Sequence, residues 1–143
     1  MTLRERALNL LARREHSRAE LARKLAAHGQ AEDIDALLDT LEGEGLLSEM
    51  RYVEAMVHAH IGRYGSLRLK QTLQRQGVVG ELADLAVQQA RAADLAACRA
   101  LWQQKYGKPP ADLKEKARQY RFLLGRGFPA DVVARVLGGE ECD

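Results

Sequence analysis

The chain has 143 residues and a formal net charge of +2, and leucine and alanine together supply 44 of its residues. Valine, isoleucine and threonine supply only 13, and because β-branched side chains lose rotamer freedom in a helix, this balance favours helices over strands. No apolar run reaches the length of a transmembrane helix, and no signal-peptide pattern opens the chain, so these features predict neither a membrane-spanning nor a secreted protein.

The first third of the chain predicts three helices. Apolar residues recur at three- and four-residue spacings over residues 3–13, which is the pattern of an amphipathic helix. Ser17 followed by Glu20 has the sequence of a capping box, so we expect a second helix to begin there and to stop at Gly29. A third helix follows, with acidic residues in its first turn, and ends near Gly43.

The middle of the chain repeats this arrangement. Ser48 is placed to cap a longer helix that ends at Gly65, and Ser66 starts another helix that stops at Gly77. We expect a short third helix from residue 81 to about residue 89, which completes a second group of three.

The last third again predicts three helices. The first begins at Arg91 and ends at Gly107, before a short proline-containing loop. Asp112 is placed to cap a basic helix that stops at Gly127, and Pro129 opens the final helix. The whole chain is therefore expected to hold nine helices in three groups.

The three groups align on their stop glycines, Gly29, Gly77 and Gly127, which are 48 and 50 residues apart. The aligned apolar sets are Leu25, Leu73 and Leu123 four residues before the glycine, Ile34, Leu82 and Val132 five after it, and Leu38, Ala86 and Val136 nine after it. Self-similarity at this period is typical of tandem helical repeats, although any amphipathic helices that end at glycine share some of it. The pattern predicts an all-α fold built as a tandem array of three three-helix repeats, elongated and curved, with units at residues 1–47, 48–90 and 91–143.

Charge is segregated along the chain in phase with these units. Residues 29–62 sum to −7, whereas residues 98–128 sum to +6. A folded stack is expected to present a positive ribbon beside a negative one, unless both are solvated faces without a partner. Arginine dominates the positive set, and its planar fork suits carboxylate or phosphate. The candidate partner-binding residues are the cations on the helices that lead to the second and third stop glycines: Arg68, Lys70, Arg75, Lys114, Lys116, Arg118, Arg121 and Arg126.

The sequence contains no pattern that indicates catalysis or a bound cofactor. It has no glycine-rich phosphate loop, no nucleophile elbow and no His/Cys cluster with metal-ligand spacing. His58 and His60 are two residues apart and face different sides of a helix, while His16 and His28 lie near helix ends, where a capping or solvated role is expected. The two cysteines suggest neither a disulfide framework nor a metal site. We therefore expect a non-enzymatic protein of the reducing cytoplasm, without cofactor or metal.

Four short stretches carry a family resemblance. They are Arg-Glu-His-Ser-Arg-Ala-Glu-Leu-Ala-Arg-Lys-Leu (14–25), Leu-Leu-Ser-Glu-Met-Arg-Tyr-Val-Glu-Ala-Met-Val (46–57), Arg-Leu-Lys-Gln-Thr-Leu-Gln-Arg-Gln-Gly-Val (68–78) and Tyr-Arg-Phe-Leu-Leu-Gly-Arg-Gly-Phe-Pro (120–129), the last led by Lys114 and Lys116. In this order, over essentially the full length, they resemble the RecX family of regulators of the recombinase RecA. One departure is Ser48-Glu49, where the family commonly has an acidic pair beginning with Asp; Ser48 can still cap the helix.

The resemblance implies a small all-helical protein that binds RecA, chiefly as its filament on single-stranded DNA. It further implies that the protein restrains the ATP hydrolysis, strand exchange and coprotease activity of RecA, and so regulates homologous recombination and the SOS response. We expect a monomer whose partner is the RecA nucleoprotein filament, with DNA phosphates as a second target and no contact with a membrane. Whether such a protein caps the filament end or lies in its groove stays open.

A stand-alone helical DNA-binding module is the alternative function. The basic helices favour it, whereas the small net charge argues against it. Gln71, Gln74 and Gln76 beside Arg75 come nearest to a set of base-reading residues.

Overall fold

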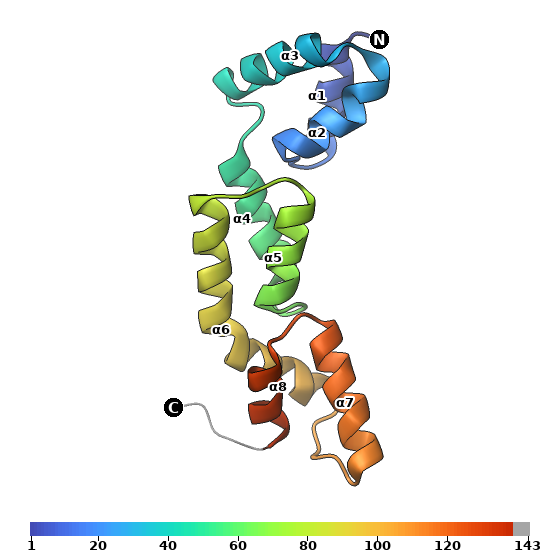
Figure 1. Ribbon diagram of the computed structural model, residues 1–143, viewed down its shortest axis with the longest axis vertical. Coiled ribbons are helices and arrows are strands. Elements are labelled where there is room, and N and C mark those ends of the chain that lie inside the picture. Colours follow the sequence, from blue (N-terminus) through green and yellow to red (C-terminus); the bar gives the residue numbers. More distant parts are fainter. Residues whose placement is uncertain (139–143) are drawn as a thin grey trace.

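The computed structural model describes residues 1–138, and within this range the chain forms α-helices joined by short loops, with no β-strand. The α-helices are α1 (Leu3–Arg13), α2 (Arg18–Leu25), α3 (Ala31–Gly43), α4 (Glu49–His60), α5 (Ser66–Arg75), α6 (Glu81–Lys105), α7 (Leu113–Gly125) and α8 (Ala130–Leu137). A short 3-10 turn, η1 (Ala26–His28), follows α2. Figure 1 shows an elongated molecule with α1–α3 at one end and α7 and α8 at the other.

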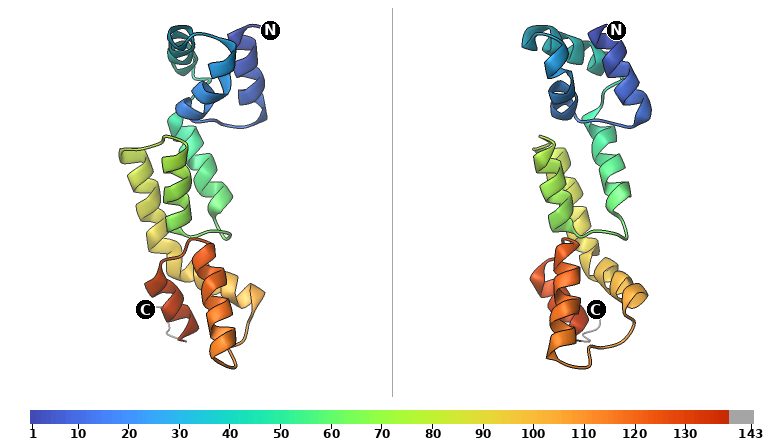
Figure 2. Two further views of the ribbon diagram at one scale, coloured as in Figure 1. Left: turned by 45° about the vertical axis from the view of Figure 1, so that its right-hand side comes forward. Right: turned by 90° about the vertical axis from the view of Figure 1, so that its right-hand side faces the viewer.

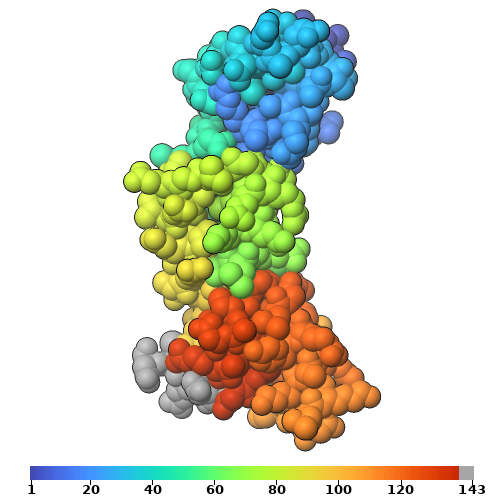
Figure 3. Space-filling model, in the orientation of Figure 1, coloured from blue at the N-terminus to red at the C-terminus, as the bar shows by residue number. Residues whose placement is uncertain are grey.

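Each third of the chain has its own hydrophobic core. The buried members are Ala7, Leu21, Leu25, Ile34, Leu38, Leu41 and Leu47 in the first core, Tyr52, Val53, Leu69, Leu73, Val78, Ala83 and Ala86 in the second, and Cys98, Leu123, Phe128, Val133, Val136 and Leu137 in the third. Figure 3 shows the same division as blue, green-to-yellow and orange-to-red regions that follow one another along the long axis. The predicted all-α array of three repeats is confirmed, and the aligned leucines Leu25, Leu73 and Leu123 are all buried.

The predicted N-terminal caps are also confirmed. A side-chain oxygen accepts a hydrogen bond from a first-turn N–H at Ser17 (from Glu20, 3.0 Å), at Ser48 (from Arg51, 3.2 Å) and at Asp112 (from Glu115, 2.8 Å). Each bond satisfies a backbone donor that the first turn of a helix leaves unpaired. These three caps therefore fix where α2, α4 and α7 begin.

The prediction of nine helices is wrong, because the described residues form eight and α6 runs unbroken from Glu81 to Lys105. This segment contains no glycine or proline and is rich in alanine, so nothing in it stops a helix. Residues 83–90 of α6 contribute to the second core, and residues 95–102 contribute to the third. The unit boundary proposed at residue 90 thus lies inside a helix that two repeats share.

The alignment of buried apolar residues is also wrong at one position, five residues after the stop glycine. Leu82 is 41% exposed, and its neighbour Ala83 is buried in its place. Gly80 has a positive φ of 105° and immediately precedes α6, so the helix begins later after its stop glycine than α3 does. The equivalent shift occurs in the third unit, where Val133 rather than Val132 is fully buried.

No helix of residues 1–138 is long and apolar enough to cross a membrane. Cys142 and the last five residues of the third predicted unit lie outside the described residues.

Candidate interaction surface

The second helices of the three units, α2, α5 and α7, follow one another end to end (Figures 1 and 2). At the first junction, the carbonyl oxygen of Gln76 accepts a hydrogen bond from the Ser17 hydroxyl at 2.7 Å. At the second junction, the carbonyl oxygen of Arg126 accepts one from the N–H of Gly65 at 2.8 Å. In both cases the acceptor directly precedes a stop glycine, and the donor is the N-cap residue of the previous unit's helix. The negative, C-terminal end of the α5 dipole therefore meets the positive, N-terminal end of α2, and the C-terminal end of α7 meets the N-terminal end of α5 in the same way.

The stop glycines are required at these junctions by close approach and by backbone conformation. A Cβ at Gly127 would lie 2.4 Å from the Cβ of Arg68, and one at Gly77 would lie 2.6 Å from the Cβ of Ala19. Both glycines have a positive φ, at 91° and 73°, which side chains rarely tolerate. Gly29, which follows η1 after the second helix of the first unit, has extended backbone instead.

Three of the predicted cations share one face of α7. Lys114, Arg118 and Arg121 are spaced by four and three residues, so they form a row along the helix, and all three are exposed. Arg118 also pairs with Glu115 at 3.1 Å, a contact at the surface of the helix that contributes little stability. Lys116 is two residues from both Lys114 and Arg118 and therefore lies on another side of α7.

The same row continues onto α5. Arg68 and Arg75 are seven residues apart, on one face, and both are exposed. The guanidinium of Arg68 donates to the carbonyl oxygen of Gly125 at 3.4 Å, and Gly125 follows Arg121 by four residues in the α7 row. Lys70, in contrast, points to another side of α5, where it lines a groove against α6.

Arg126 has a different environment from the other predicted cations. It is half-buried at the second junction, where its guanidinium lies 5.4 Å from the ring centre of Tyr64 and 5.2 Å from that of Phe122. Arg68 lies over the same Tyr64 ring at 4.4 Å. These cation–π contacts stabilise the junction between α5 and α7, so Arg126 contributes to the position of the row more than to its exposed charge.

The structure adds one cation that sequence reasoning missed. Arg23 of α2 donates to the side-chain oxygen of Gln76 at 2.5 Å, which extends the row into the first unit. Its signal was present in the sequence, because Arg23 stands six residues before its stop glycine, as Arg121 does. We call the row the basic stripe, and its members are Arg23, Arg68, Arg75, Lys114, Arg118 and Arg121.

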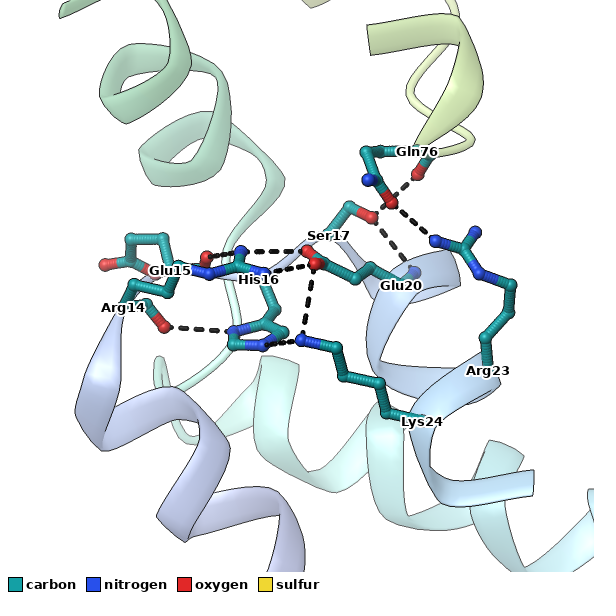
Figure 4. A network of polar contacts seen from close by, with 8 residues as sticks. All are labelled: Arg14, Glu15, His16, Ser17, Glu20, Arg23, Lys24 and Gln76. Atoms are coloured by element: carbon teal, nitrogen blue, oxygen red, sulfur yellow. Dashed lines mark hydrogen bonds and ion pairs between the residues drawn. The ribbon is translucent and has the colours of Figure 1, made fainter. Parts of the chain in front are cut away.

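A buried polar network supports the first junction (Figure 4). Glu20 is buried, and its carboxylate accepts hydrogen bonds from Arg14 and pairs with Lys24 at 3.5 Å. Burial by itself raises the pKa of Glu20, but the hydrogen bonds and charge of Arg14 leave that pKa below its ordinary value. The carboxylate therefore stays ionised, although it is almost enclosed.

His16 belongs to the same network, so its expected solvated role is wrong. The ring is buried, and its Nδ1 donates to the carbonyl oxygen of Arg14 at 3.0 Å, while Nε2 lies 3.0 Å from the Lys24 ammonium. Nε2 can accept this bond only when the imidazole is neutral. Burial, together with the charges of Arg14 and Lys24, lowers the pKa of His16.

The second junction has its own buried acid. The N-cap of α5 is Gly65, which has no side chain to offer, and Asp94 of α6 supplies the missing acceptors to Ser66. One carboxylate oxygen accepts from the Ser66 N–H at 2.9 Å, and the other accepts from its hydroxyl. Burial raises the pKa of Asp94, and burial also raises the pKa of the nearby Cys98 thiol to about 12.

The described residues contain no group of three His, Cys, Asp or Glu side chains arranged to hold a metal ion. What they do present is a stack of three-helix units whose second helices carry a continuous row of cations. The fold and this surface define an elongated helical-repeat protein with an extended basic face.

Sequence comparison assigns this repeat protein to a family. Residues 4–41 match the first three-helix domain of RecX, and residues 92–137 match the third. The chain is 46% identical to the regulatory protein RecX of Ralstonia pickettii over 99% of this chain and 89% of that one, and 49% identical to that of Leptothrix cholodnii over 96% and 88%. The chain belongs to the RecX family of regulatory proteins.

Solved structures agree on the fold. A crystal structure of regulatory protein RecX superposes with a TM-score of 0.75 at 18% identity, over 96% of this chain and 72% of that one. RecX from Lactobacillus salivarius superposes with a TM-score of 0.70, also at 18% identity, over 96% and 93%.

Proposed function

We propose that this protein binds the RecA nucleoprotein filament through the basic stripe and restrains the ATP hydrolysis, strand exchange and coprotease activity of RecA. The observation that carries the proposal is the continuity of the stripe across both junctions, from Lys114 through Arg68 to Arg23. In this proposal the protein acts by binding in the cytoplasm, as a monomer, and has no catalytic role of its own.

The dimensions of the stripe suit a filament rather than a small ligand. The helices α2, α5 and α7 contain 8, 10 and 13 residues, so end to end they span about 45 Å. A row of that length can contact several subunits of a helical polymer, whereas a single pocket would engage only one. A regulator that lies along the filament is therefore the arrangement that we favour over one that only caps its end.

Arginine chemistry defines what the stripe contacts. Five of its six members are arginines, and each guanidinium can bind a carboxylate or a phosphate through two parallel hydrogen bonds. Acidic surfaces of the recombinase subunits and phosphates of its bound DNA are both suitable targets. Gln76, one of the glutamines that would read bases in a stand-alone DNA-binding module, is already engaged by Arg23.

The test compares binding of the full chain to RecA filaments and to bare single-stranded DNA at one salt concentration, together with DNA-dependent ATP hydrolysis. We expect tighter binding to the filament and slower hydrolysis when the protein is present in amounts below RecA. Equal binding to bare DNA with unchanged hydrolysis would instead identify a DNA-binding module.

A further inference from the structure

A second surface, separate from the basic stripe, lies between α4 and α6 in the middle unit. It is an open groove with a volume of about 470 Å³. On the α4 side, Met50 is 55% exposed and Ile61 just beyond the helix is 69% exposed; on the α6 side, Leu85 is 55% exposed. These are large side chains in one continuous depression, not isolated apolar residues, and such patches mark binding sites in soluble proteins.

The groove has the shape that a third helix requires. The helix α4 and the first part of α6 both run along the long axis of the molecule (Figure 1). The groove follows α4 from Met50 to Ile61, a rise of about 16 Å or three helical turns. Between two such helices, an added helix can place an apolar ridge with residues at i, i+3, i+4 and i+7.

The charge around the groove restricts what that helix carries. Among the described residues that line the groove, Glu54 is the only carboxylate and is exposed; His58 also lines the groove, and no lysine or arginine does. The neighbouring cation Arg51 is directed away to Glu15, at 2.9 Å, and to the carbonyl oxygen of Gly45, at 2.7 Å. The rim therefore carries a carboxylate with no lysine or arginine beside it, and it complements a helix whose apolar ridge is flanked by lysine or arginine.

We propose that this groove is a docking site for an amphipathic helix of a partner protein, with an aliphatic ridge and basic flanks. The site uses α4 and α6, whereas the basic stripe uses α2, α5 and α7. The protein thus offers an acidic, apolar surface and a basic one on different helices of the same stack. Because no residue is shared, the groove can function whether or not the stripe binds the recombinase.

The test uses two synthetic helical peptides of about 15 residues with the same leucine ridge, one flanked by lysines and the other by glutamates. Binding of each to the full chain is measured by fluorescence anisotropy. We expect the lysine peptide to bind at least about tenfold more tightly than the glutamate peptide. The substitution Leu85→Gln should weaken the lysine peptide about tenfold, since it removes a central apolar contact without a change of charge.

The matched control is Leu113→Gln, which removes a leucine that is 84% exposed on α7 and lies outside the groove. It should leave binding of the lysine peptide within about twofold of the unmodified chain. Glu54→Lys should lower affinity for the lysine peptide and raise it for the glutamate peptide. Because Leu85 is also exposed, its substitution should leave the circular dichroism spectrum unchanged; should that spectrum change, Ile61→Gln takes its place.

Two outcomes would overturn the proposal. One is equal weakening by Leu85→Gln and Leu113→Gln, or equal binding of both peptides, which would mean that the groove does not recognise a basic amphipathic helix. The other is self-association of the chain in sedimentation equilibrium that Leu85→Gln abolishes, which would identify a second copy as the occupant.

Discussion

The carbonyl oxygen of Arg126 accepts a hydrogen bond from the N–H of Gly65 at 2.8 Å, across 61 positions of sequence. The carbonyl oxygen of the next residue, Gly127, accepts from the N–H of Leu67, two residues after Gly65, at 3.0 Å. The end of α7 thus satisfies two backbone N–H groups at the start of α5. The N-cap residue Gly65 cannot do so, because it has no side chain. A helix terminus in one repeat thus caps a helix of the preceding repeat, which fixes the two units relative to each other.

This junction predicts a sharp difference between two neighbouring glycines. Gly127→Ala should lower the free energy of unfolding by about 3 kcal/mol, because its Cβ would meet Arg68 and its φ is positive. Gly125→Ala, two residues earlier, should raise it by about 0.5–1 kcal/mol, since Gly125 ends α7 and a Cβ there meets nothing within 4 Å. Urea denaturation of both variants measures the difference, and equal effects would show that the close approach is not present in solution.

The aligned core leucines make a second prediction. Leu73→Ala and Leu123→Ala should each cost roughly 2–5 kcal/mol of unfolding free energy, since both side chains are enclosed in their cores. Leu124→Ala provides the control, because Leu124 directly follows Leu123 yet is exposed. Its cost should stay within about 0.5 kcal/mol in chemical denaturation. A drop of similar size in all three variants would contradict the repeat alignment.

The local features of this fold were predictable from the sequence, and the long-range ones were not. The caps at Ser17, Ser48 and Asp112 and the buried leucines depend on residues only a few positions apart. The continuity of α6 could also have been predicted, because no breaker lies between Glu81 and Lys105. The capping of α5 by Asp94 could not have been predicted. Ser66 and Asp94 are 28 positions apart in the sequence, and their contact depends on how α5 and α6 pack in space.

The candidate surface also combines features that the sequence predicts with features that only the fold reveals. Helical spacing alone places Lys70 and Lys116 on other faces than the remaining cations. The sequence was therefore sufficient to exclude these two lysines from the stripe. The continuation of the stripe from α7 to α5 and then to α2 did need it. Glu20 is a further example, since the sequence suggests only a capping-box partner of Ser17 and the fold encloses it against Arg14.

The buried imidazole of His16 predicts a dependence of stability on pH. Its pKa lies below the ordinary value of 6.5, so between these two values the unfolded chain binds a proton that the folded chain does not. The contribution to stability is therefore complete above about pH 6.5 and declines as the pH falls below it. His60, whose pKa is also lowered by burial, changes stability in the same direction.

Urea unfolding at pH 7.5 and pH 5.5 measures this dependence. His16→Gln should reduce the loss of stability between the two pH values, because glutamine does not titrate. The loss should be smaller still in the double variant with His60→Gln, because that change removes the second imidazole whose pKa burial lowers. A pH dependence that is the same in all variants would show that folding lowers the pKa of neither ring.

The basic stripe gives the last prediction. Reversal of Arg118 and Arg121 to Glu should leave the fold intact, because both side chains are exposed on α7. Binding to the RecA filament should weaken about tenfold or more, since two attractive interactions become repulsive. If DNA phosphates are among the targets, the slope of log affinity against log salt should also fall by roughly 1 for each phosphate that an arginine no longer neutralises.

The matched control is the double variant Lys70→Glu and Lys116→Glu, which changes the net charge by the same amount outside the stripe. Both lysines are exposed and lie on other faces of α5 and α7. If the two double variants weaken filament binding equally, the protein is attracted by its overall charge and the stripe has no special position. If only the arginine reversal weakens binding and relieves the inhibition of ATP hydrolysis, the binding surface lies on the face where α2, α5 and α7 join. The effect of Arg23→Glu then decides whether the filament is engaged along the whole stack, because Arg23 is the member of the stripe in the first unit.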